Sequence, residues 1–338
     1  MCPDAHDGRL LQTGEVALTP LLAPLASSVR EVLSGQSDGV PDVARAIARP
    51  RGARGLFRPG DAIWTVHGSV TTFVGGVRSL YLQALHPLAL AGIEAHSSYR
   101  QDPLGRLQRT GAFIAITTFG SEQMAQQTVD AVRAMHRKVE GSAADGRHYS
   151  AQDPRLLLWV HIALVDSMLT CYLRLGHEGT IDPDAYVRDM AVVGRAMGVP
   201  DPPASVSELR AAFADFRPEL RADALVRRTH DFVTNAPLPL QLKPGYRILA
   251  RAAWDTLPPW ALDLLDAKPR MTALDLAAAD AALRVLRLAL VASPARLAGE
   301  ARLSTADAQG DAADPRLGDP RVHGPSSTPG RAGPGTNP

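Results

Sequence analysis

The sequence predicts an all-α fold, built as a single helical domain. From Asp61 to about Ala295, apolar residues recur at the spacing of amphipathic helices, and the alternation typical of strands is scarce. Gly and Pro residues mark the breaks between these segments. Hydrophobic residues make up 45% of the 338 residues, which is enough for a sizeable core.

Several helix starts share one signal, an aspartate followed by a proline. Aspartate accepts hydrogen bonds from the free N–H groups of the first turn, and proline already has the φ angle of a first helical residue. A serine start is predicted at Ser121. The predicted helices run over about 102–119, 121–140, 153–175 and 182–197.

The composition divides the chain into three parts. Residues 1–58 are predicted to be an irregular lead-in with one or two short helices, and residues 59–300 the all-helical domain. Residues 301–338 are predicted to be a disordered tail. From Ser304 onward the tail is rich in Gly, Pro, Ser, Asp and Ala and has no aromatic residue, so it cannot bury enough apolar area to offset its ordering entropy.

Charge and cysteine usage narrow the class of protein. The formal charge is +1, from 36 basic and 35 acidic residues, so we expect no nucleic-acid partner. The two cysteines, Cys2 and Cys171, form no disulfide framework, and the first residues lack the apolar stretch of a secretory signal. We therefore expect a cytoplasmic protein.

The most apolar run, Leu156 to Leu173, contains His161 and Asp166. A membrane-spanning helix needs about 20 predominantly apolar residues. We predict that this run is a buried core helix, and we expect no stable membrane anchor.

Most catalytic motifs are missing from the sequence. It contains no GxGxxG, GxxxxGK[ST] or HExxH, and no Glu-x-x-His pair of the di-iron helical bundles. A GxSxG pattern at residues 35–39 lies in a polar, turn-like stretch rather than between a strand and a helix, so it is interpreted as a loop. What remains is a helical protein with a few histidines in apolar settings.

His136 is the strongest candidate among the ten histidines. On the helix predicted from Ser121, it shares an apolar face with Ala125, Val129 and Val132. One interpretation is a core histidine satisfied by a backbone carbonyl. The other is a haem axial ligand, with one imidazole nitrogen on iron and the other held by an acceptor.

Arg106 and Thr110 lie four residues apart on the preceding helix and share a face that continues to Phe113 and Thr117. One interpretation is the edge of an amphipathic helix, with the arginine in solvent. The other is a pair of donors directed into a polar cavity, where they would serve a propionate or bound oxygen.

Other polar residues in apolar segments have weaker assignments. Asp166 is predicted to belong to a structural polar network, because a buried aspartate is costly unless it is paired. His86, before a proline, is predicted to cap a helix junction. Glu94 and His96 do not share a helix face, although either can line a pocket.

These segments, taken in order, resemble the catalytic domain of the MpaB and latex-clearing-protein (rubber oxygenase) family. No single motif is decisive, but their order over about Asp61 to Leu175 is fairly specific. The matching segments are Trp64, Gly75-Gly76-Val77-Arg78, Leu82 to Pro87, Gly92, His96-Ser97, Arg106 to Thr110, Thr118-Phe119-Gly120, His136 to Gly141, Tyr149-Ser150-Ala151, Asp153-Pro154 and Leu157 to His161.

The resemblance implies a globin-like helical core that binds haem b. His136 matches the family's proximal histidine, and Arg106 and Thr110 match its Arg-x-x-x-Thr pair. Glu94 is the nearest candidate for the upstream glutamate proposed as a base. Arg78 and His161 are also predicted to contribute to haem binding.

The function expected on this basis is a haem b-dependent oxygenase, with dioxygen and a small or medium apolar metabolite as its substrates. Polyisoprene is not the expected substrate, because the features of secreted rubber oxygenases are missing. Two alternatives stay open: a cofactor-free helical binding or structural protein, and a non-haem iron oxidoreductase.

Overall fold

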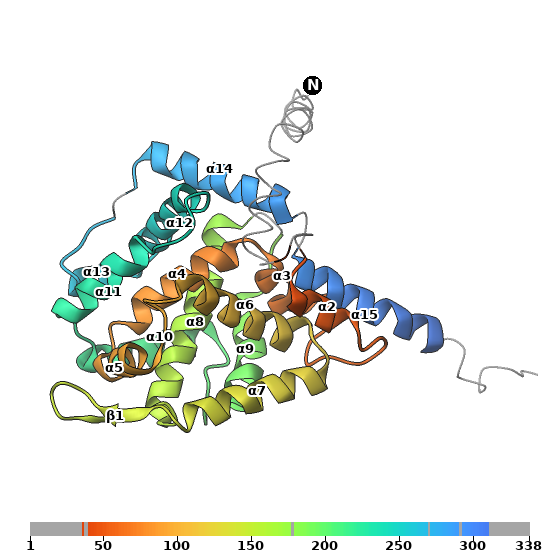
Figure 1. Ribbon diagram of the computed structural model, residues 1–338, viewed down its shortest axis with the longest axis horizontal. Coiled ribbons are helices and arrows are strands. Elements are labelled where there is room, and N and C mark those ends of the chain that lie inside the picture. The colour runs from red at the N-terminus through yellow and green to blue at the C-terminus, as the bar shows by residue number, and fades with distance from the viewer. Residues whose placement is uncertain (1–35, 37–39, 177–178, 270, 291–292, 311–338) are drawn as a thin grey trace, which may run out of the picture.

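The computed structural model describes residue 36 and residues 40–176, 179–269, 271–290 and 293–310. These residues form one helical domain with a single short hairpin (Figure 1). The all-α prediction is confirmed. In chain order the elements are α2 (Asp42–Ala48), α3 (Ala62–Gly68), α4 (Thr71–Gln83), α5 (Pro87–His96), α6 (Pro103–Phe119), α7 (Glu122–His136), β1 (Glu140–Ser142), β2 (His148–Ser150), α8 (Pro154–Leu175), α9 (Pro183–Met197), α10 (Val206–Phe216), the 3-10 helix η1 (Arg217–Glu219), α11 (Ala224–Thr234), α12 (Lys243–Asp255), α13 (Pro259–Leu264), α14 (Ala273–Leu290) and α15 (Pro294–Gly310).

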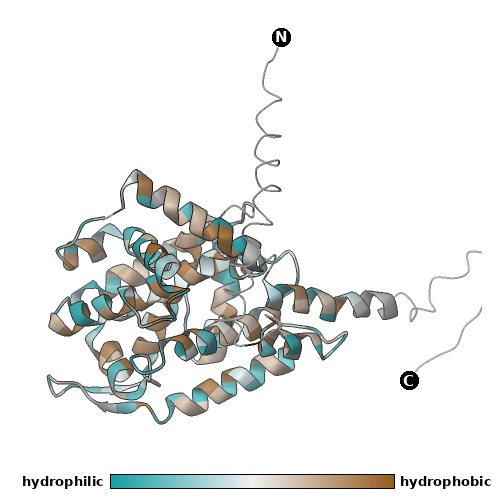
Figure 2. Ribbon diagram, turned by 45° about the horizontal axis from the view of Figure 1, so that its top comes forward, coloured by the Kyte–Doolittle hydropathy of each residue, from teal (hydrophilic) through white to brown (hydrophobic). Residues whose placement is uncertain are grey.

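Helices α4 and α8 form the centre of the core and pack along each other. Gly75 permits their close approach, because a Cβ there would lie 2.7 Å from the Sδ of Met168 and 3.1 Å from its Cα. The adjacent Gly76 has open space where its Cβ would be. Figure 2 shows hydrophobic and hydrophilic residues alternating along most helices, as expected when each helix buries one side.

Helix α8 is the apolar run seen in the sequence. By length and composition it is the one described helix that could cross a membrane, and 61% of its most apolar window is buried inside the fold. Trp159, Ile162 and Ala163 are completely buried. The prediction of a buried core helix is confirmed for this segment.

The Asp-Pro signals place three helices correctly. Helices α6, α8 and α9 begin at the prolines, and the three aspartates before them each accept a hydrogen bond from a backbone N–H of the first turn. His86 caps α5 as predicted, because its Nδ1 accepts from the N–H of Ala89 at 3.4 Å.

The predicted end of the helix from Ser121 was wrong. Helix α7 ends at His136, about four residues early, and the chain then enters the β1–β2 hairpin, in which Gly141 pairs with Tyr149. Gly146 supplies the positive φ, of 83°, that the connecting turn requires. The hairpin was missed because each strand has only three residues, too few for a recognisable alternation.

The predicted boundary between domain and tail at residue 300 was also wrong. Helix α15 continues to Gly310 and packs against α2 from the lead-in. Arg302 is fully buried and donates a hydrogen bond to the carbonyl of Phe119 at 3.2 Å, so composition alone misjudged these residues. Residues 311–338 and the first 35 residues lie outside the described part of the chain, as does most of the GxSxG pattern.

Candidate active site

A cavity of about 730 Å³ lies among helices α4, α6, α7, α8 and α9, with α11 and α12 at one side. Ligand cavities typically measure about 300–1,000 Å³ and have apolar walls with a few polar groups. This cavity has that character rather than the polar one expected from the sequence. Its apolar wall includes Val77, Leu80, Phe113, Val132, Met135, Leu157, Val160, Leu164, Met190, Val193 and Phe232.

Helices α6 and α7 pack against each other and bring the two predicted functional segments to this cavity. Asp102 fixes the start of α6 by accepting a hydrogen bond from the N–H of Gly105 at 2.8 Å. Ser121 fixes the start of α7 in the same way through the N–H of Met124 at 3.3 Å. As a result, Arg106 in the first turns of α6 and His136 at the end of α7 line the same space.

His136 is half-buried in the cavity wall and makes no hydrogen bond through its ring within the described residues. Burial lowers the pKa of His136, and the positive charge of Arg106 lowers it further. The imidazole is therefore neutral at neutral pH, which is the form that binds a metal. The alternative was a core histidine whose ring is hydrogen-bonded to a backbone carbonyl. No such hydrogen bond joins His136 to the described residues.

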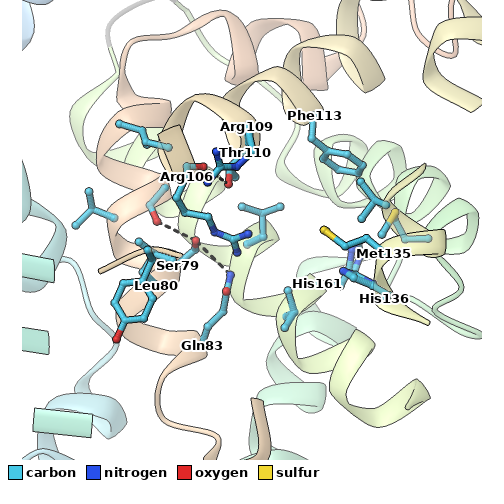
Figure 3. Close-up of a pocket in the computed structure, with 18 of the residues that line it drawn as sticks. Ser79, Leu80, Gln83, Arg106, Arg109, Thr110, Phe113, Met135, His136 and His161 are labelled. Atoms are coloured by element: carbon cyan, nitrogen blue, oxygen red, sulfur yellow. Dashed lines mark hydrogen bonds between the residues drawn. The ribbon is translucent and has the colours of Figure 1, made fainter. Parts of the chain in front are cut away.

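Arg106 presents an uncompensated charge to the cavity. Figure 3 shows its guanidinium pointing into the space from α6, with Met135 and His136 on the opposite side. Within the described residues the guanidinium has no carboxylate partner, and burial, followed by repulsion from Arg109, lowers the pKa of Arg106. A buried charge without a partner is costly, so this position favours an anionic group on a ligand.

Thr110 lies one turn further along α6, also at the cavity wall. Its hydroxyl donates to the carbonyl of Arg106 at 3.0 Å, so its proton is used within the helix. The expectation that Thr110 donates into the cavity is not what this geometry provides. Its oxygen retains lone pairs and can accept a hydrogen bond from a ligand.

His161 lines the same cavity from α8 and is nearly buried. Gly194 of α9 makes room for it, since a Cβ on this glycine would lie 2.7 Å from the His161 ring. Burial lowers the pKa of His161 to about 4. The cavity thus has two neutral imidazoles, one from α7 and one from α8.

Arg78 lies apart from this site. It is 1% exposed, and its donors are engaged by the carboxylate of Asp166 at 2.8 Å, the hydroxyl of Ser167 at 2.8 Å and the carbonyl of Thr256 at 3.0 Å. It is not among the residues that line the cavity. The predicted structural network around Asp166 is confirmed, with Arg78 rather than His161 as the partner.

Glu94 is likewise outside the cavity wall. Its carboxylate accepts hydrogen bonds from Tyr99, from Arg100 at 2.8 Å and from Thr229 at 3.1 Å. Burial raises the pKa of Glu94, but these hydrogen bonds outweigh it and hold the pKa below its ordinary value. The structure therefore gives the predicted base no access to a substrate in this cavity.

Sequence reasoning missed other residues of the site. Gln83 of α4 and Met135 of α7 line the cavity beside Arg106 and His136. Gln83 lies in a segment already matched to the family, and Met135 immediately precedes the candidate histidine, so both had a usable signal. His230 of α11 does not line the cavity; it is buried and contacts the carbonyl of Tyr81 at 2.9 Å.

The donor set bears on which cofactor fits. Within the described residues, no group of three or more His, Cys, Asp or Glu side chains is placed to hold a metal ion. Haem iron is held by the porphyrin and needs a single axial side chain from the protein. One free imidazole, an unpaired arginine and apolar walls are therefore the features that fit haem.

Two curated mycobacterial proteins match part of the chain. The uncharacterized proteins Mb2261 of Mycobacterium bovis and Rv2237 of Mycobacterium tuberculosis are each 31% identical to this chain over 105 residues, which cover 29% of it. The match spans only 39% of the length of these relatives. No solved structure matches the chain.

A family model matches a much larger part of the chain. The model describes the catalytic domain of the ER-bound oxygenase mpaB/B' and rubber oxygenase, and it covers residues 64–288. This range is more than half of the 338 residues and contains Arg106, Thr110 and His136. The chain therefore belongs to the family of mpaB and rubber oxygenase catalytic domains.

Proposed function

We propose that this protein is a haem b-dependent oxygenase that acts on a small or medium apolar metabolite. Membership of an oxygenase family supports the reaction class. The observation that carries the cofactor assignment is the pairing, in one apolar cavity, of a neutral imidazole without a partner and a half-buried arginine without a carboxylate partner among the described residues.

Each cavity residue has a defined part in this proposal. His136 would hold the haem iron through a ring nitrogen, and its lowered pKa would keep protons from competing for that nitrogen. Arg106 would bind a carboxylate of the cofactor, which would balance its charge. Haem, when bound, supplies the redox chemistry with dioxygen.

The rest of the cavity wall determines which substrates can bind. Apolar side chains such as Phe113, Leu164 and Met190 exclude water and favour an apolar molecule. Thr110 can accept a hydrogen bond beside the site of reaction, because its own proton is held by the helix. Such acceptors orient a substrate without adding a second charge.

The test is an absorption spectrum of the purified protein, with pyridine haemochrome and iron analyses. We expect an intense Soret band, and we expect His136→Ala to fold normally while losing most of its haem. His148→Ala, at an exposed strand residue, is the matched control and should keep it.

The same measurement separates the alternatives. Iron without a porphyrin spectrum would support a non-haem iron oxidoreductase. Absence of both, in protein expressed with sufficient haem, would support a cofactor-free binding protein. Undiminished haem with an unchanged spectrum in His136→Ala would refute the ligand assignment.

A further inference from the structure

A second, smaller cavity of about 210 Å³ adjoins the first. Arg106, Met135, His136 and Val160 are among the residues that line both, so the two spaces meet at the candidate active site. A volume of this size admits several waters or a small organic group. We call it the side chamber.

The side chamber lies between α5, the end of α7, the start of α8 and the β1–β2 hairpin. Figure 1 shows the hairpin beside the end of α7, and the hairpin packs against α5. The apolar part of the chamber lining includes Leu88, Ile93, Val139 and Leu156. An apolar group is therefore stabilised there relative to water.

Tyr149 and His96 are among the polar residues that line the chamber. The Tyr149 hydroxyl lies 3.3 Å from Nε2 of His96, and the two rings meet edge to face, with centroids 6.0 Å apart. Tyr149 is 5% exposed, whereas His96 lies at the surface. A phenol both donates and accepts, so its contact with His96 leaves one of these functions for a ligand.

Two glycines fix the position of Tyr149. Gly141, its partner across the hairpin, leaves the space that the phenol occupies, since a Cβ there would lie 2.6 Å from the hydroxyl oxygen. Gly92 of α5 faces the other side, where a Cβ would meet the ring at 3.5 Å. The hydroxyl is thus held by packing before any ligand arrives, which lowers the entropy cost of binding.

We propose that the side chamber is a substrate subsite that binds a small apolar group ending in a hydroxyl or carbonyl oxygen, with Tyr149 as its hydrogen-bonding residue. This inference rests on the proposed function, in which the larger cavity holds the cofactor. The substrate class then becomes an apolar molecule with one terminal oxygen, oriented away from the cofactor by that oxygen.

The probe for this subsite is hexan-1-ol, titrated into the purified holoprotein by isothermal calorimetry. Tyr149→Phe should weaken binding roughly three- to tenfold, the effect of one neutral hydrogen bond. Gly92→Leu, which fills the chamber, should abolish binding. Gly111→Leu is the matched control, because it adds the same side chain to open space on the exposed face of α6, away from both cavities, and it should leave binding intact.

Thermal unfolding and haem content are measured on the same samples. If Gly92→Leu does not fold, Gly92→Ala replaces it. Its methyl group makes only ordinary contacts, so this variant should fold. It should weaken hexanol binding because the methyl group takes up part of the chamber. Absence of hexanol binding to a haem-loaded wild type overturns the subsite. So does equal binding by wild type and Tyr149→Phe, or a loss of binding in Gly111→Leu but not in Gly92→Leu. Chamber-dependent binding by protein that takes up no haem overturns the proposed function but not the subsite.

Discussion

Two arginines, the buried Arg78 on α4 and the half-buried Arg106 on α6, differ in what surrounds them. Arg78 is enclosed by an aspartate, a serine hydroxyl and a backbone carbonyl, all within 3.0 Å. Arg106 faces a cavity, and its pKa is lowered by burial and then by the positive charge of Arg109. Because buried polar groups are normally satisfied, the difference separates a residue that holds the core together from one that awaits a ligand.

His67 and His136 differ in their hydrogen bonding in the same way as the two arginines. His67, fully enclosed in the core, lies 2.7 Å from the hydroxyl of Thr118 and 3.0 Å from that of Tyr186. His136 has no such neighbour within the described residues, although its environment also keeps it neutral. Completeness of hydrogen bonding, rather than burial alone, therefore distinguishes the site from the core.

The strongest test of the contrast is Arg78→Met. It leaves Asp166 without its partner, and breaking such a pair should lower the free energy of unfolding by about 3 kcal/mol. Urea denaturation measures this loss. The double variant Arg78→Met/Asp166→Leu should recover much of the lost stability. If Arg78→Met alone lowers the free energy of unfolding by less than about 1 kcal/mol, this pair contributes no more than an ordinary surface ion pair.

Arg106→Met should give the opposite profile. Removing a half-buried charge without a carboxylate partner should leave the free energy of unfolding of the apoprotein unchanged or slightly higher, whereas haem affinity should fall about tenfold or more with the loss of a charged hydrogen bond. Arg147→Met is the control, since this exposed arginine pairs with Asp145 and lies outside the cavity wall. If Arg106→Met binds haem as tightly as the wild type, Arg106 does not bind the cofactor.

Acid should destabilise the fold through its neutral histidines. Burial lowers the pKa of His67 to about 3 and that of His161 to about 4, both from 6.5. The unfolded chain therefore binds more protons below pH 6.5, and stability, full above this value, falls by at most about 1.4 kcal/mol per pH unit for each histidine.

His161→Leu tests this account. The pH dependence of its unfolding free energy, measured in urea, should be shallower by one proton between pH 6.5 and about 4 than that of the wild type. His148→Leu, at an exposed position, should keep the wild-type slope. Parallel slopes for wild type and His161→Leu would show that His161 titrates normally in the folded protein.

Thr110→Val should have the smallest effect. Among the described residues the hydroxyl bonds only to the carbonyl of Arg106, so the free energy of unfolding should change by less than about 0.5 kcal/mol. Oxygen reactivity or the haem spectrum should still shift, because the variant loses an acceptor at the cavity wall. If both match those of the wild type, Thr110 has no part in the site.

The sequence predicted helix starts better than helix ends. Asp102, Asp153 and Asp182 are local signals, and each caps its helix as expected. The end of α7 depends on the hairpin that follows, and the course of α15 depends on packing with α2. Contacts of that kind join distant parts of the chain, and composition does not report them.

Part of the candidate site could be predicted from the sequence and part could not. His136 and Arg106 were identified, and the structure places both at one cavity. The partners of Arg78 and Glu94 were not, because Thr256 and Thr229 lie more than 100 residues away in the chain. Side chains compete for partners in three dimensions, so a matching motif does not fix which residues remain free for a ligand.

The junction of α2 and α15 also constrains the order in which the chain can fold. The N–H of Gly52 bonds to the carbonyl of Arg302 at 2.8 Å, and these residues are separated by about 250 positions. At ribosomal rates of about 5–20 residues per second, the N-terminal segment waits roughly 12–50 s for its partner to be synthesised. Until then α2 lacks one of the helices against which it packs, so the early part of the chain is more open to proteases and chaperones during translation.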